Sequence, residues 1–244
     1  MSKANNITAF LDEQREKLKD INPVTRSFES LENYPITRSQ CIYVHNFQSG
    51  SIVFQKGVIE LLGYSADEFD SQLVHNFFHP EDKDMVLRII EASVRYAIDN
   101  HLSQDAHLYL TYRVRKKNGE YIKVLRQSSV FETDEKGRLI SNLSLLSDIS
   151  YMNTSNSVEW RFDANGVDEE AFKKYIGHQY EGIFSPRQLE IIKGISEGLS
   201  SEEIGEVLFI SKHTVDTHRR KILKISGCKN ALELVAFCKE NGII

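Results

Sequence analysis

The sequence is poor in cysteine, proline and tryptophan and has no long apolar run. Its 244 residues include three cysteines, four prolines and one tryptophan. Cys41, Cys228 and Cys238 lie too far apart for a zinc motif or a disulfide framework, so we expect a reduced, cytoplasmic protein. No stretch approaches the ~20 apolar residues of a membrane span, and residues 1–20 lack the apolar core of a signal peptide. We therefore expect no membrane partner.

Patterns typical of enzymes are also missing. There is no glycine-rich phosphate loop, no Gly-x-Ser-x-Gly elbow and no His/Asp/Glu cluster with metal-ligand spacing. His79 precedes Pro80 at the expected start of a helix, where capping is its expected role. His75, His101 and His107 could ligate a haem, but histidine is far more often a core or solvated residue. We expect a protein that is not an enzyme, with no metal site and no cofactor.

Composition allows one large or two small globular domains. Hydrophobic residues make up 41% and charged residues 27%, with a net charge of −5. Because the whole chain is acidic, any binding to nucleic acid must depend on a local cluster of positive charge.

The N-terminal half predicts an α+β module. Residues 5–20 form an amphipathic helix that either caps the next domain or pairs with a second copy of itself. Strands are expected at 41–47 and 52–54, short helices at 56–62 and 65–69, and a longer helix over 79–100. Three strands follow at 107–117, 120–132 and 139–149, and Asn118-Gly119 is a two-residue hairpin signal. This order predicts an antiparallel sheet with helices on one side.

Three short motifs in this module carry a family resemblance. They are Gly63-Tyr-Ser-Ala-Asp-Glu-Phe69, His79-Pro-Glu-Asp82 and Lys117-Asn-Gly-Glu-Tyr121. In this order and spacing, residues 40–150 resemble a PAS domain. The resemblance implies a sensory and dimerising module in which a small-molecule ligand between sheet and helices is possible and haem is disfavoured. No cysteine occurs between Leu61 and Asp148, so the flavin-binding photosensor branch is not expected.

Residues 151–183 form a connector. Trp160 and Phe162 alternate with charged residues, which indicates a short strand or a docking segment, and 168–176 has a helical pattern.

The C-terminal unit has the start and stop signals of four short helices. Ser185-Pro-Arg-Gln188 and Ser200-Ser-Glu-Glu203 are capping boxes, Gly198 ends the first helix, and Asn230 caps the fourth. Only a short turn at Phe209-Ile210 separates the second helix from the third. Such an all-α arrangement is typical of a helix-turn-helix unit.

The third helix begins after Ser211 and has two distinct faces. Val215, His218, Ile222 and Ile225 share the expected packed face, whereas the opposite face is polar and carries His213, Thr217, Arg220 and Lys224. Residues 211–226 contain five Lys and Arg residues against one Asp, which suits a phosphate-binding surface.

Residues 184–244 resemble the LuxR-type DNA-binding domain. The resemblance rests on Ser185-Pro-Arg-Gln188 with Glu190, on Gly198 with Ser200 and Glu203-Ile204, and on Ile210-Ser-x-x-Thr-Val215 with His218 and Ile222. It implies that Glu190, Ile204, Leu208, Val215 and Ile222 are scaffold, and that Thr217 and Arg220 touch bases or adjacent phosphates. The full set of expected DNA-binding residues is Lys212, His213, Thr214, Asp216, Thr217, Arg219, Arg220, Lys221 and Lys224.

Three positions depart from the family pattern. The family commonly has a basic residue at Asp216, asparagine at Lys221 and alanine at Gly205. The carboxylate of Asp216 either accepts a hydrogen bond from a cytosine amino group or pairs with Arg220 four residues later.

These observations predict four segments: an N-terminal helix and linker at 1–37, a PAS-like sensory and dimerisation domain at 38–150, a connector at 151–183 and a LuxR-type helix-turn-helix domain at 184–244. The expected function is dimeric, DNA-binding transcription regulation controlled by a ligand or partner of the PAS domain. Double-stranded DNA and a second copy of the chain are the expected partners, and RNA polymerase is a further candidate. The alternative is a protein-interaction adaptor whose helical unit docks on protein through Glu190, Glu197, Glu202, Glu203 and Glu206.

Overall fold

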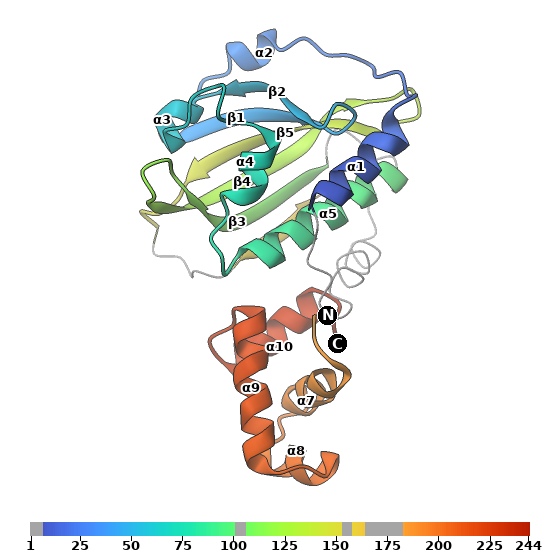
Figure 1. Cartoon of the computed structure of the whole chain (residues 1–244), viewed down its shortest axis with the longest axis vertical. Coiled ribbons are helices and arrows are strands. Elements are labelled where there is room, and N and C mark those ends of the chain that lie inside the picture. Colours follow the sequence, from blue (N-terminus) through green and yellow to red (C-terminus); the bar gives the residue numbers. More distant parts are fainter. Residues whose placement is uncertain (1–6, 101–105, 153–157, 164–182) are drawn as a thin grey trace. The chain divides into compact units, whose positions relative to one another are not determined.

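The computed structural model describes residues 7–100, 106–152, 158–163 and 183–244. They fall into two compact units, one made by the residues up to 163 and the other by those from 183 onward (Figure 1). Each unit is considered separately. The helix expected at 168–176 and the histidine at 101 lie outside the described residues.

The first unit is built on a six-stranded antiparallel sheet with the strand order β2-β1-β5-β4-β3-β6. The strands are β1 (Gln40–Asn46), β2 (Ser51–Lys56), β3 (His107–Arg115), β4 (Tyr121–Thr133), β5 (Leu139–Asp148) and β6 (Glu159–Asp163). The predicted hairpin between β3 and β4 is confirmed, with Gly119 at a φ of 90°. The alternation at Trp160 and Phe162 also marks a strand, because β6 pairs with the edge of β3.

Helices α1 (Ile7–Leu18), α4 (Ser71–Asn76) and α5 (Lys83–Asn100) lie over one face of the sheet, and α3 (Val58–Leu62) lies near β1 (Figure 1). Helix α1 packs beside α5, where Phe10 and Leu18 are buried. The Arg95 guanidinium donates to both carboxylate oxygens of Glu13, at 2.6 and 2.7 Å, and holds the pKa of Glu13 at about 2. Of the two alternatives for the N-terminal helix, these contacts favour the cap.

The opposite face of the sheet is covered by the segment around α2 (Glu29–Glu32). The ring of Phe28 stacks between Phe54 and Phe131, with centroid distances of 5.2 and 5.5 Å. Leu31 and Val44 complete this small apolar cluster, so residues of the expected N-terminal linker belong to the packed unit.

One predicted helix is wrong. Residues 65–69 form a turn, in which the Glu68 carboxylate accepts from the Ser65 backbone N–H and hydroxyl. The helix lies instead at 71–76, where Asp70 has an extended backbone and caps it by accepting from the Leu73 N–H at 2.7 Å. Asp70 thus separates the preceding turn from α4: its extended backbone ends the turn, and its side chain caps the helix.

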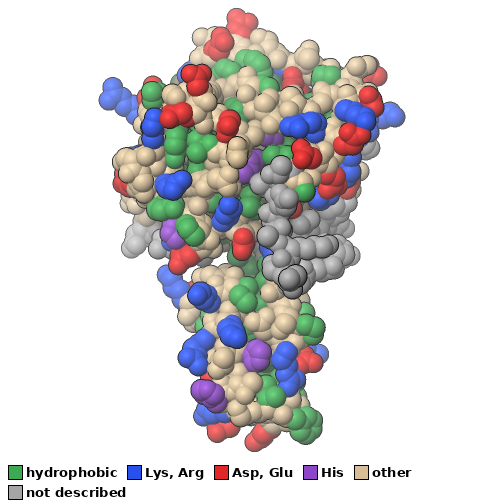
Figure 2. All heavy atoms as spheres, viewed as in Figure 1, with side chains coloured by type: hydrophobic (Ala, Val, Ile, Leu, Met, Phe, Trp, Pro, Cys, Tyr) green, Lys and Arg blue, Asp and Glu red, His purple; other side chains and the backbone are tan. Residues whose placement is uncertain are grey.

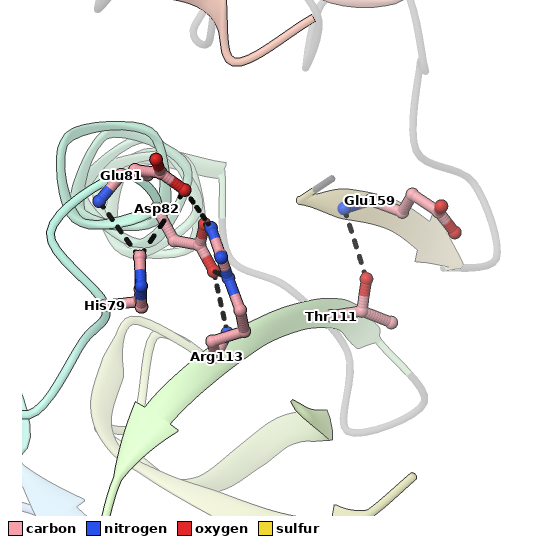
Figure 3. A network of polar contacts seen from close by, with 6 residues as sticks. All are labelled: His79, Glu81, Asp82, Thr111, Arg113 and Glu159. Atoms are coloured by element: carbon pink, nitrogen blue, oxygen red, sulfur yellow. Dashed lines mark hydrogen bonds and ion pairs between the residues drawn. The ribbon is translucent and has the colours of Figure 1, made fainter. Parts of the chain in front are cut away.

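The His79-Pro-Glu-Asp82 motif fixes the start of α5 to strand β3 (Figure 3). The buried Asp82 carboxylate accepts from the Arg113 backbone N–H at 2.8 Å and from its Nε at 3.0 Å. Arg113 also pairs with the exposed Glu81 at 2.9 Å. Nδ1 of His79 accepts from the Glu81 N–H at 3.2 Å, so this histidine closes the turn at 80–82 that precedes α5, whose first residue is Lys83 rather than the expected residue 79.

The second unit consists of α7 (Pro186–Ser196), α8 (Ser201–Leu208), α9 (Lys212–Ser226) and α10 (Ala231–Glu240). Both predicted capping boxes are formed, at Ser185 and at Ser200. The four helices share one hydrophobic core. Ile204 of α8 packs with its fully buried residues from α7, α9 and α10, which include Ile191, Ile192, Val215, Ile222 and Leu234. The chain therefore combines an α+β sheet unit with an all-α four-helix unit, as the sequence predicts.

Candidate nucleic-acid interface

The third helix of the small unit, α9, starts and ends on clear local signals. The Ser211 hydroxyl accepts from the Thr214 N–H at 3.1 Å, and Gly227 ends the helix with a φ of 71°. Its packed face carries Val215, Ile222 and Ser226, all buried. The expectation that Ile225 joins this face is wrong, since 46% of this residue is exposed. At ~3.6 residues per turn, Ser226 rather than Ile225 continues the Ile222 row.

Apart from Ile225, the exposed and half-buried surface of α9 is mostly polar. All nine predicted DNA-binding residues lie on this one helix. Those in the exposed class are Lys212, His213, Arg220, Lys221 and Lys224, and those that are half-buried are Thr214, Asp216, Thr217 and Arg219. Figure 2 shows the resulting Lys and Arg side chains, with histidines among them, along the helical unit.

Two of the cations already have partners on α8. Nη1 of Arg219 donates to the Ser201 hydroxyl at 3.0 Å, and Lys212 pairs with Glu202 at 3.3 Å. Arg219 follows Val215 by four residues, which turns it toward the packed side and explains its partial burial. Sequence reasoning missed both partners because they are contributed by another helix, across a turn, with no fixed spacing.

Arg220 is positioned by its own helix. Its Nη2 donates to the Thr217 hydroxyl at 3.3 Å and its Nε to the Asp216 backbone carbonyl at 3.4 Å. Within the described ranges, no ion pair joins the Asp216 carboxylate to Arg220, so the alternative of an intrahelical pair is not what the structure contains. The two long hydrogen bonds leave the guanidinium exposed.

The turn between α8 and α9 is held by backbone contacts and by one arginine. The Ile210 N–H donates to the Gly205 carbonyl at 2.9 Å, and Phe209 has a left-handed φ of 56°. Arg187 on α7 pairs with Glu190 at 2.7 Å and donates to the Leu208 carbonyl at 2.6 Å. These contacts fix the end of α8, so α9 leaves the turn in a defined direction.

The histidines considered for haem lie in different surroundings. His75 is buried beside His45, with ring centroids 5.9 Å apart, and its Nδ1 contacts the Ser71 carbonyl. Burial lowers the pKa of His75 to about 4 and that of His45 to about 3. His107 lies at the start of β3, half-buried beside Tyr109.

In the described part of the chain, no group of three His, Cys, Asp or Glu side chains could hold a metal ion. None of the helices described is long and apolar enough to cross a membrane.

Family comparisons assign both units. Residues 51–145 match the PAS fold family, and residues 182–238 match the bacterial regulatory proteins of the luxR family. The chain thus contains a PAS domain followed by a LuxR-type helix-turn-helix domain.

Curated relatives match only part of the chain. YxjL of Bacillus subtilis, an uncharacterized transcriptional regulatory protein, is 38% identical over 61 residues, which is 25% of this chain and 28% of that protein. The oxygen regulatory protein NreC of Staphylococcus aureus is 37% identical over 62 residues, 25% of this chain and 29% of NreC. An aryl hydrocarbon receptor nuclear translocator homolog of Drosophila melanogaster is 28% identical over 95 residues, 38% of this chain and 14% of that protein. Each match thus spans less than a third of the relative's length.

Several solved structures align with most of the chain. VqmA of Vibrio cholerae covers 88% of this chain and 86% of its own, with a TM-score of 0.36 and 13% identity. The N-terminal domain of a diguanylate cyclase with a PAS/PAC sensor from Marinobacter aquaeolei covers 46% of this chain and 96% of its own, with a TM-score of 0.39 and 20% identity.

Proposed function

We propose that the chain is a cytoplasmic transcription regulator that binds double-stranded DNA through α9. The observation that carries the proposal is the exposed polar face of α9, whose position is fixed by a capped α8 and a backbone-bonded turn. A helix held in this way can enter a major groove and present its outer side chains to base edges and phosphates. The match to bacterial regulatory proteins supports this role and gives no reason to expect catalysis.

Roles on α9 follow from exposure. Arg220 and Thr217 lie together at the middle of the outer face, so we assign them to base edges or adjacent phosphates. We assign the exposed residues Lys221, Lys224 and His213 to phosphates. Lys212 is assigned to a phosphate as well, once it is released from its ion pair with Glu202. Arg219 is assigned to a phosphate beside the α8 end. Thr214 sits in the first turn, where its hydroxyl already contacts Ser211, and Asp216 is free to accept from a cytosine amino group.

Binding as a dimer is part of the proposal. One four-helix unit offers few phosphate contacts, and two copies on adjacent half-sites would add theirs. The PAS domain is the candidate for dimerisation and for sensing a ligand or partner, and RNA polymerase is a candidate partner at the promoter.

The adaptor alternative has less support. Of the five glutamates that suggested it, Glu203 completes a capping box, Glu190 pairs with Arg187 and Glu202 pairs with Lys212. These acidic side chains therefore have local structural partners that do not require a docked protein.

The test measures DNA binding by the full chain with fluorescence anisotropy, using pooled genomic fragments to select a tight site. Arg220→Ala should weaken binding to that site by about 1–3 kcal/mol if the guanidinium contacts a base. Arg38→Ala is the matched control, because it removes the same charge from an exposed site on the other unit. Binding that is absent from every fragment pool, or equal losses in the two variants, would contradict the proposal.

A further inference from the structure

A charged arginine lies inside the PAS domain. Arg126, in the middle of β4, is 6% exposed and faces the side of the sheet that α5 covers. Its Nε and Nη2 donate to the Ser144 hydroxyl at 3.0 and 2.9 Å, and Ser128 Oγ lies 3.5 Å from Nη2. The guanidinium carbon is 6.0 Å from the ring centroid of Tyr43. These partners are all neutral, and among the described residues no carboxylate pairs with Arg126.

Such a cation is costly unless an anion accompanies it. Arginine stays protonated in proteins, so Arg126 cannot relieve its burial by losing a proton. An unpaired charge in a protein interior carries a large desolvation penalty, which hydroxyl dipoles offset only in part. The nearby side chains of His45 and His75 cannot balance the charge, because burial lowers the pKa of both and leaves them neutral. A negatively charged group bound beside Arg126 would offset this cost.

The guanidinium lines a cavity of about 40 Å³ between α5 and strands β3 to β6. Arg126, Ser128 and Asn142, whose side chains are in hydrogen-bond contact, line the cavity together with apolar residues that include Val94, Ala97 and Leu108. The volume exceeds the ~10–15 Å³ needed for one water, so it can admit a small organic group.

Further buried polar atoms lack partners, one on Asn142, which lines the cavity, and two on His45, which is not among the lining residues. Asn142 donates from Nδ2 to Ser128 at 2.7 Å, but its Oδ1 has no hydrogen-bond partner. His45 pairs with Asn142 across the strands, is 4% exposed, and has no partner at either ring nitrogen. Because buried polar atoms are nearly always hydrogen-bonded, these groups indicate that bound water or a polar ligand belongs here, and the Asn142 Oδ1 acceptor needs a donor such as water.

We propose that this cavity binds a small aliphatic carboxylic acid. Its carboxylate would accept charge-assisted hydrogen bonds from Arg126 and Ser128, and its alkyl chain would lie against Val94, Ala97 and Leu108. This proposal rests on the proposed function, because it supplies the ligand that the sensory domain of a regulator would detect. It assigns a chemical class to that ligand: one negative charge at the head and a short apolar tail.

Isothermal titration calorimetry on the full chain tests the proposal. The probes are sodium acetate, propionate and butyrate, with neutral propionamide and inorganic phosphate as comparisons. We expect saturable binding of at least one carboxylate, and binding of propionamide that is at least ~tenfold weaker, since the amide carries no charge. Arg126→Gln should weaken carboxylate binding by a similar factor. Arg38→Gln, an exposed change of the same charge, should leave it unchanged.

A second variant covers the case in which Arg126→Gln does not fold. Ala97→Val keeps the guanidinium but adds methyl groups to the apolar lining, so it should weaken butyrate binding more than acetate binding. The proposal is overturned if no carboxylate binds the wild-type chain, if phosphate binds as well as the best carboxylate, or if both cavity variants bind like wild type. DNA binding is measured on the same samples. DNA binding without carboxylate binding refutes only this inference, whereas the reverse result refutes only the proposed regulator.

Discussion

Replacing Asp82 by alanine should destabilise the PAS domain through the loss of one buried ion pair. The Asp82 side chain is 4% exposed and that of Arg113 is 17% exposed, so little water can replace the carboxylate. The change removes the carboxylate that accepts hydrogen bonds from the Arg113 backbone N–H at 2.8 Å and from its Nε at 3.0 Å (Figure 3). Breaking a buried pair on one side costs about 3–5 kcal/mol, and the residual exposure of Arg113 favours the lower limit.

A loss of ~3 kcal/mol should lower the melting temperature of a unit of this size by roughly 6–12 °C. Differential scanning calorimetry of the full chain measures it, with the PAS transition separated from that of the helical unit. Glu81→Ala is the control, because Glu81 contacts the same guanidinium but its side chain is 72% exposed, and exposed pairs contribute about 0–1 kcal/mol. Equal shifts for the two variants would refute the view that burial makes Asp82 the anchor.

Two further predictions concern the sheet core and the turn before α9. Gly205→Ala should disturb the turn in spite of alanine's helix propensity, because the new Cβ would lie 2.7 Å from the Ile210 carbonyl oxygen. We expect urea unfolding to show a net loss of about 1 kcal/mol in stability, and DNA binding to weaken. A gain in stability would refute the clash. Burial lowers the pKa of His45 from its ordinary value of 6.5 to about 3. Between these two pH values, His45 is protonated in the unfolded chain but not in the folded chain. Stability should therefore be lost as pH falls from 6.5 toward 3, by ~1.4 kcal/mol per pH unit from this residue, and His45→Gln should flatten urea-midpoint profiles measured between pH 7 and pH 5; equal slopes would contradict this assignment.

Local signals in the sequence predicted much of the fold. The capping boxes at Ser185 and Ser200, the hairpin at Asn118-Gly119 and the alternation at Trp160 all act within a few residues, and the structure contains each corresponding element. A local signal also produced the mistaken helix at 65–69, because the same Ser-x-x-Glu spacing that caps a helix can form an isolated turn.

Contacts between distant segments could not be predicted in the same way. Arg126 lies on an alternating strand between Val124 and Ser128, but only the packing of α5 and pairing with β5 show that its side is the buried one. Likewise, the bonds of Arg219 to Ser201 and of Lys212 to Glu202 depend on how the turn places α8 against α9. The sequence could nominate the cations of the interface, but not the partners that two of them have.

The salt dependence of DNA affinity is the most direct test of the central claim, that the outer face of α9 binds phosphates and bases. If each chain makes about four phosphate contacts, the plot of log affinity against log salt concentration should have a slope of about −3.6 per chain, and the double change Lys221→Ala with Lys224→Ala should reduce it by about 2. A slope near zero, or a slope that the double change leaves unaltered, would contradict the account.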